Sequence, residues 1–141
     1  MHVLYRHFVI NIALNHVNLV LIIHLRLLKK VNKVVFVSSI AVYGPSFDLK
    51  NENSDPRPIH AYGRSKLLAE GIFKTWYQEK PYERSLVICR PAVIFGQGEN
   101  GNFTRMAKAI SRNSFVIPGS RNIVKSCGYV KDLSKSLLKM L

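Results

Sequence analysis

The chain has 141 residues, of which 48% are hydrophobic, and a formal net charge of +13 at pH 7. This length suits one ordinary domain and is too short for two, and the hydrophobic content is sufficient for a globular core. The Lys and Arg residues are scattered, with no run of five and no aromatic-rich RNA-binding pattern. We therefore expect a solvated basic surface and no nucleic-acid partner.

The apolar stretch Phe8–Leu28 has about the 20 residues that a membrane span requires. Polar side chains interrupt it, among them Asn15, His24 and Arg26, and each is costly in hydrocarbon. No signal-peptide n-region or cleavage site is recognisable. We predict no membrane association and, instead, a helix covered on several sides by protein, with helical spacing clearest over Val17–Lys30.

Two short β-branched runs, Lys33–Val37 and Ser85–Cys89, lack polar alternation, which is typical of parallel strands covered on both faces. Between them, Gly44–Pro58 is rich in Asn, Asp, Ser and Pro and is predicted to be a surface loop. A helix is predicted from Ala61 to about Gln78, because its apolar residues fall on one face and Pro81 follows it.

The remaining elements follow a glycine-rich turn at Gly96–Asn102. They are a short helix over Phe103–Ser111, a strand around Cys127–Val130 and a helix over Leu133–Leu141. The alternation of strands and helices predicts an α/β fold with a partial, doubly wound parallel sheet and right-handed crossovers. We find no repeat and no linker, so residues 1–141 are predicted to form a single partial domain.

The two cysteines, Cys89 and Cys127, lie in apolar, strand-like surroundings. Neither belongs to a CxxC or Cys/His pattern that binds metal, so we predict buried thiols and no metal site. Unpaired cysteines indicate a reducing, cytoplasmic compartment.

Tyr62 and Lys66 are four residues apart, so on a helix they lie one turn from each other on one face. A nearby ammonium favours the phenolate form of tyrosine, so the pair suits proton transfer. The same spacing also occurs by chance on the polar face of amphipathic helices. Ser39 follows the strand Lys33–Val37, which places a hydroxyl at the carboxyl edge of the sheet, where ligands of open α/β sheets bind.

Three blocks carry a resemblance to a known family: Val37–Gly44 (VSSIAVYG), Ala61–Lys66 (AYGRSK) followed by Glu70, and Arg90–Gly96 (RPAVIFG). In this order and spacing, they resemble the NAD-dependent epimerase/dehydratase family, which are extended short-chain dehydrogenase/reductases with a Rossmann-like fold. The likeness extends from about Asn32 to the end of the sequence. It implies an enzyme similar to UDP-glucose 4-epimerase, or a related dehydratase or reductase.

The resemblance implies a role for each matching residue. Ser39 would be the catalytic hydroxyl, Tyr62 the general base and Lys66 the group that binds the nicotinamide ribose, while Ser38 caps or supports. The implied contacts with NAD or NADP are Ser38, Tyr62, Lys66, Pro91, Ala92 and Val93. The implied contacts with a nucleoside-diphosphate sugar are Ser39, Tyr43, Asn102 and Lys125. The resemblance also allows a homodimer of the intact enzyme.

Some of these residues have a simpler interpretation. Asn102 could cap the helix that begins at Phe103. Lys125 stands where many members have an arginine, and this replacement keeps the charge but loses the bidentate geometry. Lys125 could also simply be solvated. The segment Gly96–Gly101 fits G-x-G-x-x-G, but no acidic residue lies about 20 positions further on to bind a ribose. We therefore predict that this loop lies on the substrate side and does not cradle a pyrophosphate.

The family's G-x-x-G-x-x-G turn is not found in this sequence. We therefore expect a fragment that lacks the N-terminal glycine-loop unit and that, by itself, binds NAD weakly or not at all. A dehydratase would favour an acidic residue just after the catalytic hydroxyl, and Ile40 and Ala41 supply none, which favours an epimerase or reductase. The alternatives are a non-catalytic basic binding module and an inert remnant of such an enzyme.

Overall fold

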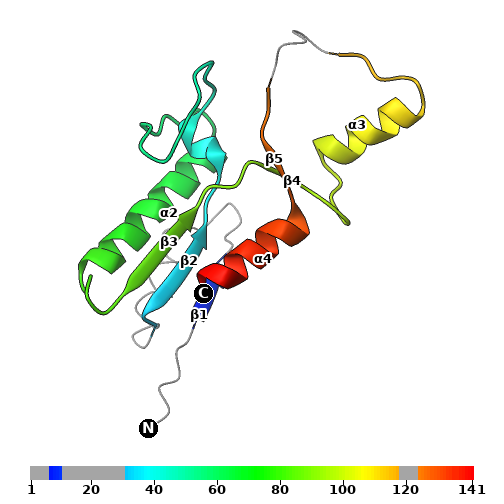
Figure 1. Ribbon diagram of the computed structural model, residues 1–141. Coiled ribbons are helices and arrows are strands. Elements are labelled where there is room, and N and C mark those ends of the chain that lie inside the picture. Colours follow the sequence, from blue (N-terminus) through cyan, green and yellow to red (C-terminus); the bar gives the residue numbers. More distant parts are fainter. Residues whose placement is uncertain (1–6, 11–30, 118–123) are drawn as a thin grey trace. The chain divides into compact units, whose positions relative to one another are not determined.

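The computed structural model describes residues 7–10, 31–117 and 124–141 (Figure 1). The chain divides into two compact units, which are described separately below. The first comprises Met1–Arg90 with Leu137–Leu141, and the second comprises Pro91–Ser136. Within the described residues, no helix combines the length and the apolar character needed to cross a membrane.

The first unit contains a parallel three-stranded sheet in the order β1-β2-β3 (Figure 1). Its strands are β1 (His7–Ile10), β2 (Lys33–Val37) and β3 (Ser85–Cys89). In the central strand, Val34 and Phe36 on one face and Val35 on the other are fully buried. The prediction of a strand covered on both faces is therefore confirmed for β2, as is the α/β class with parallel strands. It is wrong for β3, which has no fully buried residue, since it has only one neighbouring strand among the described residues.

Strand β1 corrects the prediction of a helix beginning at Phe8. Residues His7–Ile10 pair in parallel with β2, with Phe8 opposite Val34 and Ile10 opposite Phe36. The run Phe-Val-Ile suits a strand as well as a helix, and pairing with a neighbouring strand decides between them. The predicted helix Val17–Lys30 lies outside the described residues.

Helix α2 (Ala61–Gln78) packs its apolar residues against β2 and β3, and its bounds match the prediction. Phe73 and Trp76 are buried, and the ring centroid of Phe73 lies 4.7 Å from that of Phe36. Ring pairs at this separation are favourable beyond their buried area. This packing holds the helix along the sheet, which fixes the position of its first turn beside the carboxyl end of β2.

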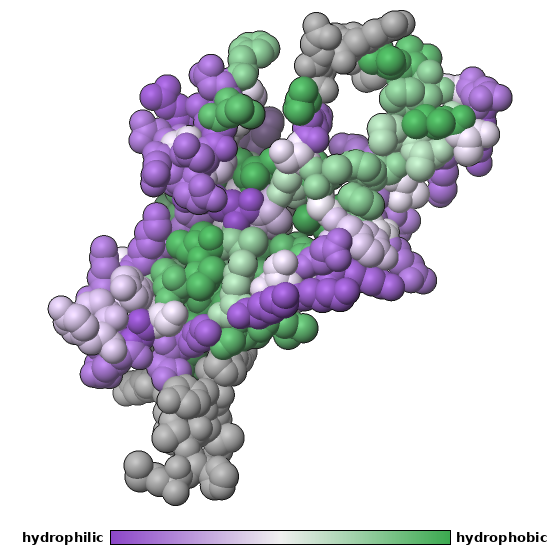
Figure 2. Space-filling view, viewed as in Figure 1, coloured by the Kyte–Doolittle hydropathy of each residue, from purple (hydrophilic) through white to green (hydrophobic). Residues whose placement is uncertain are grey.

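A 3₁₀ turn, η1 (Ile40–Tyr43), follows β2 and was not predicted. The first turn of α2 approaches it so closely that a Cβ atom at Gly63 would collide with the carbonyl oxygen of Ala41. Gly44 ends the turn with a φ of +69°, a conformation that glycine adopts without strain. The polar loop after Gly44 is exposed, as predicted, and Figure 2 shows mostly hydrophilic residues gathered over it.

The second unit contains a parallel two-stranded sheet of β4 (Val93–Phe95) and β5 (Cys127–Tyr129). Helix α3 (Asn102–Ser111) follows β4, and helix α4 (Val130–Met140) follows β5. The two helices confirm the predicted ones, although α4 begins three residues earlier than expected. Strand β4 was not predicted. The rings of Phe95 and Phe103 stack with centroids 5.0 Å apart.

Candidate active site

Side chains on one face of helix α2 form hydrogen bonds with the carboxyl end of β2. Three positions of this face, Gly63, Lys66 and Glu70, are three and four residues apart, so they lie in line along the helix. The Nζ atom of Lys66 donates a hydrogen bond of 3.0 Å to the carbonyl oxygen of Val37. The hydroxyl of Ser38 donates one of 2.6 Å to Oε1 of Glu70. Two consecutive residues at the carboxyl end of β2 are thus bound by two consecutive turns of the helix.

Lys66 and Tyr62 meet at this end of the sheet, as the sequence predicts. The Nζ atom of Lys66 lies 5.7 Å from the ring centroid of Tyr62 and 5.4 Å from that of Phe36. Lys66 is 3% exposed, whereas Tyr62 is 38% exposed. Burial lowers the pKa of the Lys66 ammonium, because water no longer solvates its charge. The arrangement places a buried cation beside a phenol that a ligand can reach.

Ser39 begins the 3₁₀ turn, and its Oγ accepts a hydrogen bond of 3.1 Å from the backbone N–H of Ala41. This contact uses Oγ as an acceptor and leaves the hydroxyl proton to be donated to a ligand. Ser39 is therefore the capping residue, and the buried Ser38 is the supporting one. Both serines lie where the first of the three sequence blocks predicts them, directly after β2.

A buried ion pair lies beneath these residues. Arg90 donates from Nε to Oε1 of Glu70 at 2.8 Å and from Nη2 to Oε2 at 2.6 Å. Its Nη1 atom donates to the hydroxyl of Tyr43 at 2.6 Å. The side chain of Glu70 is 1% exposed and that of Arg90 is 14% exposed. Bidentate, charge-assisted hydrogen bonds of this kind are stronger than hydrogen bonds between neutral groups, so the pair joins α2 firmly to the end of β3.

No role was predicted for Glu70 or Arg90, although both stand in the three sequence blocks. A signal was present for each. Glu70 lies one turn after Lys66 on the same face, next to Ala69 in the apolar part of the helix. Arg90 directly follows strand β3, which is partly buried from Leu86 to Cys89. Charged residues in apolar surroundings are retained when they are paired, which could have indicated a partner for each.

The electrostatics of the pair favour two ionised partners. Burial by itself raises the pKa of the Glu70 carboxyl, but hydrogen bonds from Arg90 and Ser38 outweigh it, so the pKa lies below its ordinary value of 4.5. The hydrogen bond to Glu70 raises the pKa of Arg90. The ionised pair is consequently part of the folded state at neutral pH.

A pH dependence of stability follows from the lowered pKa of Glu70. The stabilisation is fully present above about pH 4.5, the ordinary value, and is lost as the pH falls through the lower folded value. We expect the free energy of unfolding of Glu70→Gln to lie below that of the unmodified chain by a constant amount above pH 5 and by a shrinking amount below pH 4.5. Urea unfolding measured by circular dichroism at pH 3.5 to 7 checks this, and a gap that widens towards low pH would contradict it.

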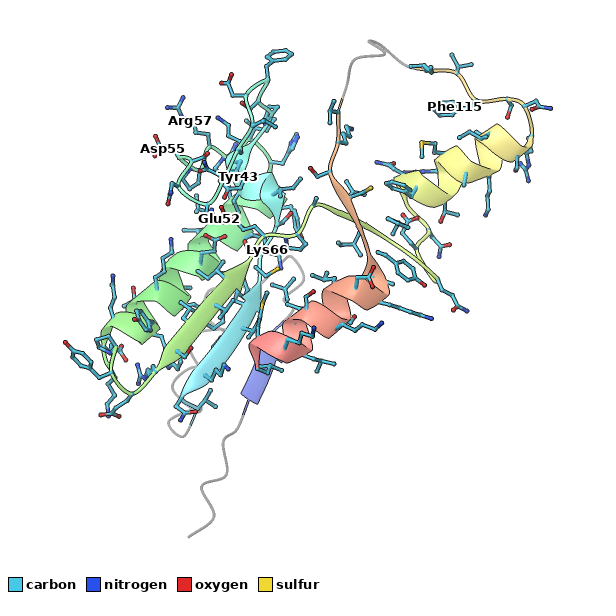
Figure 3. The ribbon with its side chains drawn as sticks, viewed as in Figure 1. Tyr43, Glu52, Asp55, Arg57, Lys66 and Phe115 are labelled. Atoms are coloured by element: carbon cyan, nitrogen blue, oxygen red, sulfur yellow. The ribbon has the colours of Figure 1, made fainter. Side chains whose placement is uncertain are left out.

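Tyr43, a predicted substrate contact, is built into the scaffold of the site. It is 8% exposed, and its hydroxyl accepts the hydrogen bond from Arg90. Its ring also borders a cavity of about 480 Å³ formed with the loop that follows η1, including Asp55 and Arg57 (Figure 3). Figure 3 shows Tyr43 and Lys66 at the end of the sheet where β2 and β3 finish. A contact between Tyr43 and a substrate stays a prediction.

The other predicted contacts lie in the second unit, described by itself. Asn102 is the first residue of α3, and Gly101 occupies the capping position, so Asn102 does not cap the helix. Its Oδ1 atom accepts from Nη2 of Arg105 at 2.7 Å. Lys125 is exposed, ahead of β5. The remaining predicted contacts, Pro91, Ala92 and Val93, lead into and begin β4, and their contacts with a cofactor stay predictions.

In the glycine-rich loop Gly96–Gly101, the carboxylate of Glu99 lies at the N-terminus of α3. The Glu99 carboxylate accepts a hydrogen bond of 2.9 Å from the backbone N–H of Thr104, in the first turn of α3, and one of 2.7 Å from the Thr104 hydroxyl. A carboxylate at a helix N-terminus takes the place that a phosphate would need. This geometry supports the interpretation that the loop does not cradle a pyrophosphate.

The two cysteines differ in their surroundings. Cys89, at the end of β3, is partly buried, and burial raises the pKa of its thiol. Cys127 is exposed, so the prediction of a buried thiol is wrong there, because β5 has only one neighbouring strand among the described residues. Among the same residues, no group of three or more His, Cys, Asp or Glu side chains could hold a metal ion.

Comparison with known proteins gives these residues a family context. The family model described as "NAD dependent epimerase/dehydratase family" matches residues 8–141. An N-acetyl-alpha-D-glucosaminyl-diphospho-ditrans,octacis-undecaprenol 4-epimerase of Escherichia coli O157:H7 is 40% identical over 103 residues, which are 73% of this chain and 31% of that protein. The chain thus spans about a third of the length of this curated relative.

Two solved structures have the same fold. MoeE5 in complex with UDP-glucose and NAD is 27% identical, with a TM-score of 0.67 over 82% of this chain and 42% of that chain. A UDP-N-acetylglucosamine 4-epimerase from Methanobrevibacter ruminantium M1, in complex with UDP-N-acetylmuramic acid, is 27% identical, with a TM-score of 0.62 over 77% of this chain and 37% of that chain. The Rossmann-like fold expected from the sequence is confirmed by these neighbours. By the match of its family model over most of its length, the chain belongs to the NAD-dependent epimerase/dehydratase family.

Proposed function

We propose that this chain is the catalytic segment of an NAD-dependent 4-epimerase that acts on a nucleoside-diphosphate sugar. The observation that carries the proposal is the placement of Lys66 beside the accessible phenol of Tyr62, with Lys66 bonded to the strand end from which Ser39 follows. The relatives support the reaction class, since two of them are named 4-epimerases. The unpaired thiols of Cys89 and Cys127 suit the reducing conditions of the cytoplasm.

In this proposal, Tyr62 removes the proton from the sugar hydroxyl that is oxidised and later returns a proton to the same oxygen. Ser39 donates its hydroxyl hydrogen to that oxygen, because its Oγ lone pair already accepts from Ala41. NAD, when bound, supplies the acceptor and then the donor of the hydride. Returning the hydride to the opposite face of the sugar ring inverts the carbon.

The residues present suit the ribose of NAD. An ammonium has three protons, and Lys66 uses one of them on the carbonyl oxygen of Val37, so two remain for ribose hydroxyls. Lys66 would hold the ribose while its charge favours the phenolate of Tyr62. Burial and the hydrogen bond to Val37 restrict Lys66 to this position, which orients the ammonium before a ligand arrives.

Epimerisation is favoured over dehydration by the residues after the catalytic hydroxyl. A dehydratase needs an acid close to the leaving hydroxyl group, and Ile40 and Ala41 have apolar side chains. Both residues belong to η1, so Ser39 passes directly into the turn without an acidic neighbour. A sugar hydroxyl bound here can be oxidised and reduced again, but η1 has no carboxyl group that could protonate a leaving hydroxyl.

A chimeric enzyme tests the proposal, because the chain spans 37% of the UDP-N-acetylglucosamine 4-epimerase from Methanobrevibacter ruminantium M1. The segment that matches in that relative is replaced by the corresponding residues of this chain, so that the relative supplies the rest of the enzyme. We expect the chimera to interconvert UDP-N-acetylglucosamine and its 4-epimer, the reaction that the name of the parent enzyme gives, as measured by NMR of the sugar protons. A folded chimera without any conversion, beside an active parent enzyme, would reject the proposal.

A further inference from the structure

The pair Glu70–Arg90 is largely buried, and the proposed chemistry does not use it. Its contacts nevertheless converge on the segment that carries Ser39. Glu70 accepts from the hydroxyl of Ser38, the residue before Ser39, and Arg90 donates to the hydroxyl of Tyr43, the last residue of η1. The pair thus binds both ends of a six-residue segment.

The backbone of this segment has few other long-range contacts. The N–H of Ser38 donates to the carbonyl oxygen of Cys89 at 2.7 Å, and the remaining backbone bonds of η1 are internal to the turn. On its other side, the segment touches Gly63, where the helix leaves no room for a side chain. A short 3₁₀ turn is a weak structure by itself, so its geometry depends on the side chains that hold its ends.

We propose that Glu70 and Arg90 are positioning residues that hold the turn Ser38–Tyr43 in place and thereby orient the hydroxyl of Ser39. The assignment rests on the proposed function only in calling that hydroxyl catalytic. The physical reason is the set of four hydrogen bonds, between 2.6 and 2.8 Å, that join α2, the end of β3 and the two ends of the turn. With the carboxylate absent, Ser38 and the guanidinium of Arg90 both lose their common partner.

Amide hydrogen exchange on the 141-residue chain tests this without any ligand. In Glu70→Gln, we expect the amides of Ser38, Ala41 and Val42 to exchange roughly fivefold faster, since a hydrogen bond of this kind contributes about 1 kcal/mol. The amides of Val34–Phe36 in the centre of β2 should change much less. A role in global stability alone would accelerate both groups by the same factor, and this outcome, or no acceleration in the turn, would overturn the proposal.

Two further variants make the result specific. Glu79→Gln removes an exposed carboxylate, which pairs with Arg84 near the end of the same helix. It should leave the rates of amide exchange in the turn unchanged. Arg90→Lys keeps the charge but loses the bidentate contact with Glu70. It should therefore accelerate amide exchange in the turn Ser38–Tyr43 less than Glu70→Gln does. If Glu70→Gln does not fold, Arg90→Lys decides the question by the same comparison. These readouts do not depend on catalysis, so an inactive chimera would reject the proposed function and leave this assignment standing.

Discussion

Replacing Tyr62 by Phe in the chimera is expected to lower kcat by about 10²- to 10⁴-fold, the usual contribution of a general base. The substitution removes one hydroxyl and keeps the ring, so the contact between Lys66 and the ring is retained. KM should change little, because the phenol takes part in the proton transfer of the transition state and contributes little to binding of the substrate. Initial rates of epimer formation at several substrate concentrations separate the two constants.

A matched control is available on the same helix. Tyr77 is 36% exposed, close to the 38% of Tyr62, but lies near the other end of α2. Tyr77→Phe removes the same hydroxyl at similar exposure and should leave kcat unchanged. Equal rates for the Tyr62→Phe enzyme and the unmodified chimera would remove Tyr62 from the mechanism.

Replacing Arg90 by Met is expected to cost about 3–5 kcal/mol of the free energy of unfolding, or to prevent folding at 25 °C. The reason is the partner that remains. Glu70 is buried, so without Arg90 its carboxylate would keep Ser38 as its one hydrogen-bond donor among the described residues and only the charge of Lys74, which makes no hydrogen bond to it. Urea unfolding of the 141-residue chain at pH 7, followed by circular dichroism, measures the change.

The control for this change is an ion pair that is solvated. Lys80 and Glu83 are joined at 2.8 Å, but their side chains are 52% and 69% exposed. Lys80→Met should have no measurable effect, because water solvates the carboxylate that is left behind. A loss of stability as small for Arg90→Met as for Lys80→Met would show that Glu70 is solvated or neutral in the folded chain.

Much of the fold could be predicted from local patterns. The run Lys33–Val37 has no polar residue after its first position, which indicates burial on both faces, and the structure has that strand with the same bounds. Helix α2 was predictable because its apolar residues recur at helical spacing and Pro81 lies beyond its end. Strand β1 was not, since Phe-Val-Ile suits a strand or a helix, and its parallel pairing with β2 is a contact distant in sequence.

The catalytic candidates were predictable for a similar reason. Tyr62 and Lys66 are related by the geometry of one helix, and Ser39 by its place after a strand, so their relation is local. The roles of the two serines needed the structure. Both hydroxyls stand at the same strand end in the sequence, and their orientations decide that Ser39 caps the turn while Ser38 bonds to Glu70.

The sequence alone determined the α/β class, the buried strand β2, the helix that carries Tyr62 and Lys66, and the family that these residues resemble. Each depends on periodicity within one element or on the order and spacing of elements and motifs along the chain. The tertiary structure alone decided which residues hold the site together. Glu70 is 32 residues from Ser38 and 20 from Arg90, so no local pattern relates them. Their partnership exists because the packing of α2 against the sheet brings a carboxylate to the ends of two strands.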